Sequence, residues 1–207
     1  MPGALLRLVL WVCALPLSAL PTTIAHESAH AGVRRLFLRW PTFILIPGGA
    51  SKFHSIRFFG IEWRVGQLSE WRAWIRGGGL TGPWPPPQPL LQSTTQAMVV
   101  LLVLSGPLTS LFLGVCICIG ATFWHSVWSP ILSATAIFPI ADAGVNLLPL
   151  HQNGQPSDGL FLINHLPSDH ETMFHVLFFV LSTACLLAAL ACTLFGTFFI
   201  RSGRPWF

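Results

Sequence analysis

Long apolar runs are the feature that most constrains the fold of this chain. Residues 4–25 are mostly apolar, with Arg7 as the single charge, and further runs cover about 96–124, 130–150 and 172–200. A helix needs about 20 apolar residues to cross the hydrocarbon core of a bilayer. Of the 207 residues, 53% are hydrophobic and 9% are charged, whereas soluble domains carry about 25% charged residues. The sequence predicts an all-α polytopic membrane protein of about four transmembrane helices, forming a single domain over residues 1–207.

Positive charge is concentrated in the first connection between these runs. Of eleven Lys and Arg residues, eight lie between Arg34 and Arg76. Short loops rich in Lys and Arg stay in the cytoplasm, so the net charge of +4 indicates membrane orientation rather than a nucleic-acid partner. We expect a multi-pass protein of a plasma or inner membrane, with this basic loop on the cytoplasmic side.

Two local patterns stand out within the same connection, which covers residues 31–95. Ile56–Phe58 and Ile61–Val65 alternate in polarity around Phe59-Gly60, which predicts a small β-hairpin in the first loop. Gly77–Pro87 is rich in Gly and Pro, which predicts an irregular loop or flexible gate.

The motif His26-Glu27-Ser28-Ala29-His30 follows directly on the first apolar run. Residues four apart share a face of a helix, so both imidazoles can bind one Zn²⁺ while Glu27 lies next to a metal-bound water. Ionisable groups at the end of a membrane-spanning segment are costly and are functional by default. A cleaved signal peptide ending at Ala25 is the competing interpretation of residues 4–25. It would leave His26 at a new N-terminus, without a scaffold for its helix.

A catalytic zinc site needs a third protein ligand and one open position. Asp158 is the best candidate, because it lies just after the third apolar run. With about four spans, that run ends on the same membrane side as the first, so Asp158 can meet His26 and His30 near one surface. Asp142, a carboxylate within the third run, is the alternative third ligand.

Three motifs in this order resemble the site-2 protease family of intramembrane zinc metalloproteases. They are His26-Glu27-x-x-His30, then Ser105-Gly106-Pro107, then Asn146-Leu147-Leu148-Pro149 followed by Ser157-Asp158-Gly159. The resemblance covers a catalytic core of about residues 5–165 and leaves 172–200 as an additional C-terminal transmembrane helix. The sequence departs from the family in an Asn-to-Asp segment lengthened by residues 151–155, and in Ser110, where the family usually has Asn.

The resemblance implies a role for each residue of the motifs. His26, His30 and Asp158 would bind one Zn²⁺ per chain, Glu27 would be the general base, and Asn146 would position substrate or stabilise the oxyanion. The implied function is zinc-dependent intramembrane endopeptidase activity through a metal-activated water, close to the cytoplasmic side. The substrate would be a membrane-spanning protein or a residual signal peptide. Two alternatives are a non-catalytic membrane scaffold or regulator of the same fold, and a metal or proton transporter.

Overall fold

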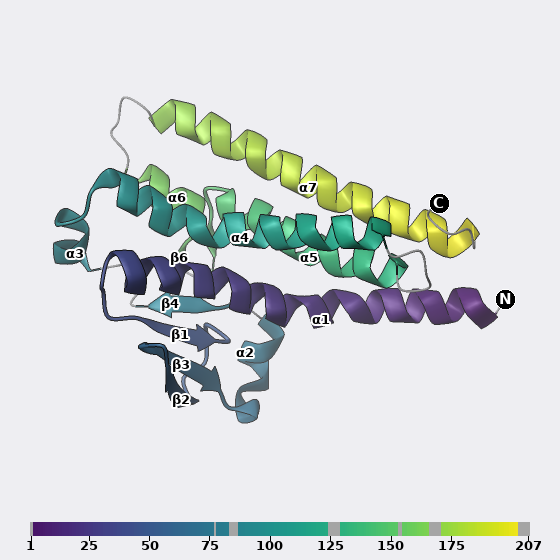
Figure 1. Cartoon of the computed structure of the whole chain (residues 1–207), viewed down its shortest axis with the longest axis horizontal. Coiled ribbons are helices and arrows are strands. Elements are labelled where there is room, and N and C mark those ends of the chain that lie inside the picture. Colours follow the sequence, from purple (N-terminus) through teal and green to yellow (C-terminus); the bar gives the residue numbers. More distant parts are fainter. Residues whose placement is uncertain are drawn as a thin grey trace.

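Four long helices lie side by side and form an elongated bundle (Figure 1). The computed structural model describes residues 2–76, 78–82, 87–123, 129–152, 155–165 and 171–202. The long helices are α1 (Pro2–Gly32), α4 (Gln96–Phe123), α5 (Ser129–Leu147) and α7 (Glu171–Ser202). Since α1 and α5 run in one direction and α4 and α7 in the other, the C-terminal ends of α1 and α5 lie at the same end of the bundle (Figure 1).

Three helical segments are long and apolar enough to cross a membrane: Leu8–Phe37, Gln96–Ala121 and Thr172–Leu194. The apolar part of α5 is shorter, Ala134–Leu147, and this helix packs between its neighbours with Ala136 and Ala143 fully buried. The structure therefore supports membrane association, with three segments of spanning length among the described residues where the sequence predicted about four.

Helix α1 is longer than the first apolar run. It passes through Pro16 and Pro21, continues through the His26–His30 motif to Gly32, and is followed by a π-helical turn, Val33–Phe37. The motif thus lies inside a continuous helix, whereas the sequence placed it at the end of the span. Its last turns are held by packing, because Ala31 is buried against Ile44 and Ile46 of the sheet.

The predicted hairpin is present, but it belongs to a larger sheet. Strands β2 (Phe53–Phe58) and β3 (Ile61–Gly66) pair antiparallel. Phe59 and Gly60 adopt positive φ angles of 49° and 73°, as a two-residue type I′ turn requires.

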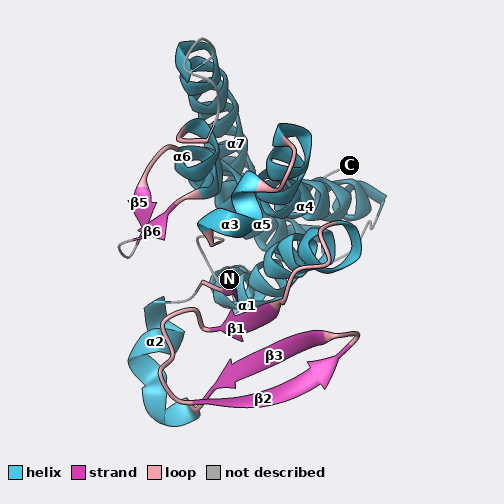
Figure 2. Ribbon diagram, turned by 90° about the vertical axis from the view of Figure 1, so that its left-hand side faces the viewer, coloured by secondary structure: helices cyan, strands magenta, loops and turns pink. Residues whose placement is uncertain are grey.

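β1 (Phe43–Ile46) pairs parallel with β3, and β4 (Leu80–Gly82) pairs antiparallel with β1, so the strand order is β2-β3-β1-β4. The all-α prediction is therefore too narrow. The prediction of an irregular loop over residues 77–87 is wrong for Leu80–Gly82, while residues 77 and 83–86 lie outside the described part. Figure 2 shows the sheet projecting from one side of the bundle beside α1.

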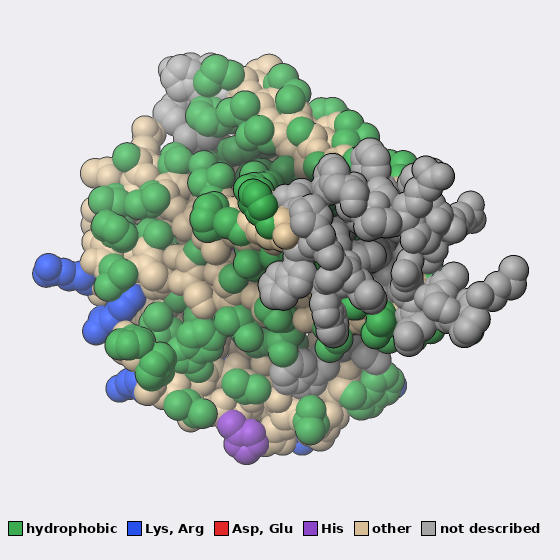
Figure 3. All heavy atoms as spheres, turned by 45° about the vertical axis from the view of Figure 1, so that its right-hand side comes forward, with side chains coloured by type: hydrophobic (Ala, Val, Ile, Leu, Met, Phe, Trp, Pro, Cys, Tyr) green, Lys and Arg blue, Asp and Glu red, His purple; other side chains and the backbone are tan. Residues whose placement is uncertain are grey.

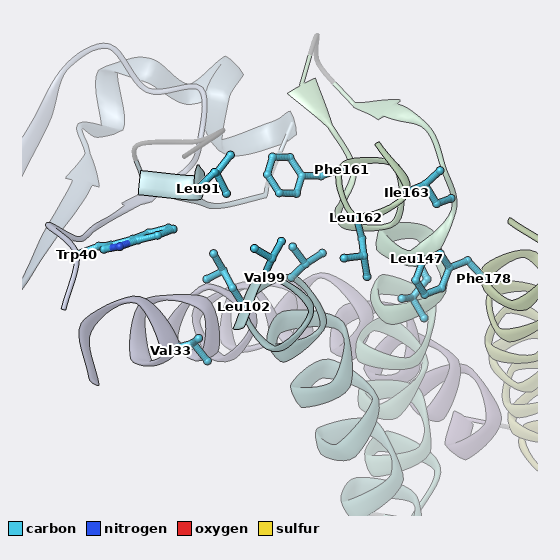
Figure 4. Packing of buried hydrophobic residues seen from close by; sticks show 11 residues of the cluster. Val33, Trp40, Leu91, Val99, Leu102, Leu147, Phe161, Leu162, Ile163 and Phe178 are labelled. Atoms are coloured by element: carbon cyan, nitrogen blue, oxygen red, sulfur yellow. The ribbon is translucent and has the colours of Figure 1, made fainter. Parts of the chain in front are cut away.

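Short elements lie beside the sheet or at the end of the bundle where α1 and α5 finish (Figure 1). They are a 3₁₀ turn (Leu68–Glu70), α2 (Trp71–Arg76), α3 (Gln88–Gln92), β5 (His151–Gln152), β6 (Gln155–Pro156) and α6 (Asp158–Ile163). One apolar cluster ties this end together: Val33, Trp40, Leu91, Val99, Leu102, Val103, Leu147, Phe161, Leu162, Ile163 and Phe178 (Figure 4). Because Phe161, Leu162 and Ile163 are all buried in it, α6 is held firmly against α4, α5 and α7.

The outer surface of the described helices is largely apolar, as their composition predicts. Large apolar side chains such as Phe112, Val180 and Leu194 are exposed on α4 and α7. Figure 3 shows hydrophobic side chains spread over the described part of that face, with the visible Lys and Arg side chains along its lower and left margin. An apolar surface of this kind is typical of helices that contact lipid.

Candidate metal centre

His26 and His30 lie one helical turn apart on α1 and are both buried. Their Nε2 atoms are 3.1 Å apart, and their rings meet edge to face with centroids 4.9 Å apart. The spacing of four residues predicted this shared face. The two imidazoles therefore present one nitrogen each to the same point inside the bundle.

Asp158, the first residue of α6, brings a carboxylate to the same point. Its Oδ2 lies 3.2 Å from Nε2 of His26 and 3.4 Å from Nε2 of His30. Strands β5 and β6 pair antiparallel, and the backbone N–H of Ser157 donates to the carbonyl of Leu150 at 2.8 Å. The lengthened segment thus loops away from the bundle and leaves Asp158 beside the imidazoles.

Three observations test whether this group fits a metal ion. The ligand atoms are 3.1, 3.2 and 3.4 Å apart, close to the spacing of about 3.3 Å that bonds of 2.0–2.1 Å at tetrahedral angles require. Oδ2 of Asp158 is buried and accepts no hydrogen bond in the described part of the chain. All three atoms lie within 4.8 Å of one another. The buried His26–His30–Asp158 group can hold a metal ion.

The far side of each imidazole faces an acceptor. Nδ1 of His30 lies 2.7 Å from the carbonyl oxygen of Leu102, and Nδ1 of His26 lies 3.0 Å from Oδ2 of Asp142. A carbonyl or an ionised carboxylate can only accept, so each Nδ1 carries the proton and each neutral imidazole turns the lone pair of Nε2 inward. Two lone pairs and a carboxylate directed at one point favour a cation there.

Asp142, the alternative third ligand, takes a different place from Asp158. Its carboxylate meets the outward nitrogen of His26, on the opposite side of the ring from the metal-binding point. Ser110 donates to Oδ2 of Asp142 at 2.7 Å, and Asn146 donates to Oδ1 at 3.1 Å. Asn146, expected to contact substrate or the oxyanion, therefore uses its amide to hold Asp142.

Gly106 on α4 makes room for the imidazoles. A Cβ atom at this position would collide with the Nε2 atoms of both His26 and His30. The Ser105-Gly106-Pro107 motif thus lets the backbone of α4 pass directly beside the ligand atoms. Ser105 adds a hydroxyl 3.2 Å from Nδ1 of His30.

Glu27 is buried beside the sheet rather than within the ligand group. The hydroxyl of Thr81 on β4 lies 2.7 Å from Oε2 of Glu27 and 2.9 Å from its carbonyl oxygen. A Cβ at Gly79 would collide with the Glu27 side chain, so the chain leading into β4 packs directly on this carboxylate. Glu27 therefore lies between the imidazole pair on its own helix and the last strand of the sheet.

The electrostatics of Asp158 favour its charged form. Burial alone would raise its pKa, but positive charge at His30 and His26 outweighs burial and holds the pKa of Asp158 well below its usual value; with neutral imidazoles, a bound cation would supply that charge. Metal ligation requires a deprotonated carboxylate. Asp158 is in the form that binds a cation.

Sequence reasoning missed two parts of this site. It did not place Ser110 against His26 and Asp142, although Ser110 lies four residues after Gly106 and therefore on the same face of α4. It also missed Thr81, for which the sequence carries no signal, because β4 is only three residues long and lies in a stretch with the composition of a loop.

Comparisons of the chain with protein-family models, curated proteins and solved structures found no match.

Proposed function

We propose that the chain is a zinc-dependent intramembrane endopeptidase of the site-2 protease type. One observation carries the proposal. Two imidazoles from α1 and a carboxylate that follows α5 meet at one buried point, and a second buried acid, Glu27, is next to His26 in the sequence. Helices of membrane-spanning length surround this point. A hydrolytic metal centre explains why these four ionisable groups are buried among such apolar helices.

The donor set favours zinc over other divalent ions. Two histidines and one carboxylate with an open fourth position are the ligand set of catalytic zinc in several hydrolases. Calcium and magnesium prefer oxygen ligands alone. When bound there, Zn²⁺ supplies Lewis acidity to a substrate carbonyl and lowers the pKa of a coordinated water to about 7.

Glu27 carries the proton transfers in this proposal. Its Oε atoms accept a proton from the attacking water and return it to the nitrogen of the leaving amine. Thr81 supports the role, because its hydroxyl, 2.7 Å from Oε2, fixes the direction of the carboxylate. Burial beside β4 keeps bulk water away from the groups that exchange the proton.

Strand β4 is the most suitable edge for substrate. A peptide bond in a transmembrane helix is shielded by helical hydrogen bonds, so the substrate segment has to become extended, and extended peptides add to free strand edges. The other edge strand of the sheet is β2, which β3 and β1 separate from β4 and Glu27. β4 pairs with β1 alone among the described strands, and its Thr81 touches Glu27.

The proposed topology follows from the direction of the helices. With 19 residues, α5 extends about 28 Å, which is long enough to complete a bundle of four spans. The basic first loop then faces the cytoplasm, together with the C-terminal ends of α1 and α5 and therefore the site. The substrate would be a membrane-tethered protein or a residual signal peptide in a plasma or inner membrane.

Glu27→Gln tests the proposal. The full chain is reconstituted in vesicles with zinc and a panel of labelled single-span peptides, each with a Gly-Pro or Asn-Pro step in its apolar segment, and fragments are measured by mass spectrometry. Loss of the general base is expected to slow cleavage about 10²–10⁴-fold, with zinc content unchanged.

Glu62→Gln is the matched control for this experiment, because Glu62 lies on β3 and pairs with Arg64. It is expected to cleave like the parent. Equal cleavage by the Glu27→Gln chain would overturn the proposed mechanism. A parent chain that binds zinc and cleaves no peptide of the panel would favour the non-catalytic scaffold instead.

A further inference from the structure

Asp142 is a carboxylate inside an apolar helix that does not reach the metal-binding point. Among the described residues, three polar atoms that can donate contact its carboxylate: Nδ1 of His26 at 3.0 Å, Oγ of Ser110 at 2.7 Å and Nδ2 of Asn146 at 3.1 Å. These donors come from α1, α4 and α5. We propose that Asp142 is a positioning residue that fixes the tautomer and orientation of His26 for metal binding, and that Ser110 and Asn146 hold Asp142 in place. This inference rests on the metal centre of the proposed function.

The donors and acceptors around His26 support this positioning role. An ionised carboxylate has no proton to give, so the proton in the His26–Asp142 contact stays on Nδ1 and the lone pair stays on Nε2. The Ser110 hydroxyl has one proton, which it donates to Oδ2 of Asp142, and its oxygen is 3.0 Å from Nδ1 of His26. Asp142 therefore selects the tautomer that can ligate a cation, and Ser110, whose proton is used on Asp142, holds that carboxylate in place.

Charge supplies an independent argument. A divalent cation buried among apolar helices is costly unless negative charge lies close by. Asp158 supplies one negative charge directly, and Asp142 supplies a second through the ring of His26. Behind His30 lie two neutral groups, the carbonyl of Leu102 at 2.7 Å and the hydroxyl of Ser105 at 3.2 Å. The two histidines thus differ, and His26 is the one through which the second charge acts.

Metal affinity is the readout, because a purely structural role for Asp142 would not change it in a folded chain. Asp142→Asn removes the charge at nearly constant volume, and Ser110→Ala removes only the supporting hydroxyl. Zinc dissociation constants are measured by chelator competition on the purified full chain, and Co²⁺ absorption spectra report the geometry of the site. Partners in the outer shell of a metal site are typically worth 10–100-fold in affinity.

We expect Asp142→Asn to weaken zinc binding about 10–100-fold and to change the Co²⁺ spectrum, and Ser110→Ala to weaken binding by a smaller factor. Since Ser110 acts through Asp142, the double variant should lose no more than Asp142→Asn alone. Thr135→Val is the control on α5, the helix that carries Asp142, because Thr135 bonds only to the carbonyl of Leu132 among the contacts described. This variant should bind zinc like the parent.

Two outcomes overturn the inference. Unchanged zinc affinity in folded Asp142→Asn would remove the positioning role, and strictly additive losses in the double variant would show that Ser110 acts independently. Because affinity is measured without substrate, the inference can fail while zinc-dependent cleavage stands. It can also hold in a chain that binds zinc and cleaves nothing.

Discussion

At the scale of single residues, the metal centre requires a glycine at position 106 as well as its ligand side chains. Gly106 is buried in the middle of α4, where glycine costs helix stability of about 1 kcal/mol relative to alanine. The structure supplies the reason for this cost, because a Cβ there would collide with the Nε2 atoms of both imidazoles. The residue is therefore required by the ligand group and disfavoured by the helix.

Gly106→Ala is expected to weaken zinc binding while α4 remains helical. Overpacking a filled site costs about 1–3 kcal/mol, which corresponds to a loss of affinity of roughly 5- to 150-fold. Gly120→Ala is the matched control on the same helix, since nothing lies within 4 Å of a Cβ at that position, and it should leave affinity unchanged. Titration of both variants with zinc, alongside circular dichroism, distinguishes them. Equal zinc affinity in the two variants would show that contact with α4 does not restrict the position of the imidazoles.

Sequence reasoning succeeds at this scale where spacing is local. His26 and His30 are one turn apart, so their shared face could be read directly. Asp142 and His26 are on different helices, and no periodicity relates them. Asp142 was recognised as an ionisable group in a span, but whether it would face the cation or the back of a histidine depends on how α5 is rotated about its axis. That rotation is set by packing between helices.

At the scale of elements, the segment between α5 and α6 shows how an insertion is tolerated. Leu150 and Ser157 are bonded to each other at the base of the β5–β6 hairpin, and Ser157 also caps α6 by accepting from the N–H of Leu160. The position of Asp158 is thus fixed by Ser157 and by the buried residues of α6. We therefore expect the β5–β6 hairpin to contribute less than Ser157 to the position of Asp158.

Replacing residues 151–156 with Asn-Gly should leave the zinc dissociation constant within about threefold of the parent value. Asn-Gly favours a two-residue type I′ hairpin turn, which the existing bond from Ser157 to Leu150 already suits. Adding Ser157→Ala to the shortened chain removes the cap, which is typically worth about 1 kcal/mol, and should weaken binding about fivefold. Chelator competition measures both chains. A large loss in the shortened chain with Ser157 intact would show that the hairpin itself positions Asp158.

Only part of the sheet could be predicted from the sequence. The β2–β3 hairpin was predictable because its alternation and its turn residues are contiguous. β4 pairs with β1 through Thr81 opposite Ile44, and a three-residue strand in a stretch rich in Gly and Pro has no pattern of its own. Its place is decided by partners: β1 on one side, and Glu27 with α1 against its Thr81.

At the scale of the whole molecule, most of the basic residues belong to one region, since eight of eleven Lys and Arg residues lie between Arg34 and Arg76. The helices expose apolar side chains, whereas the exposed basic residues Arg35, Arg39, Lys52, Arg57 and Arg72 belong to the end of α1 and the sheet region. The metal centre lies in the half of the bundle next to this basic region. Under the proposed function, this arrangement would place the site at one membrane surface, where water and an unwound substrate segment could enter.

Cysteine labelling tests that arrangement. In a chain whose five cysteines are replaced by serine or alanine, Lys52→Cys reports on the turn before β2, and Ser126→Cys reports on the connection between α4 and α5. The positive-inside rule places the basic loop in the cytoplasm, so a membrane-impermeant maleimide should label position 52 only after permeabilisation and position 126 in intact cells. Labelling of both positions from one side would contradict an odd number of crossings between them. The reverse pattern would keep the bundle but place the metal centre at the outer surface, where a cytoplasmic substrate segment could not reach β4.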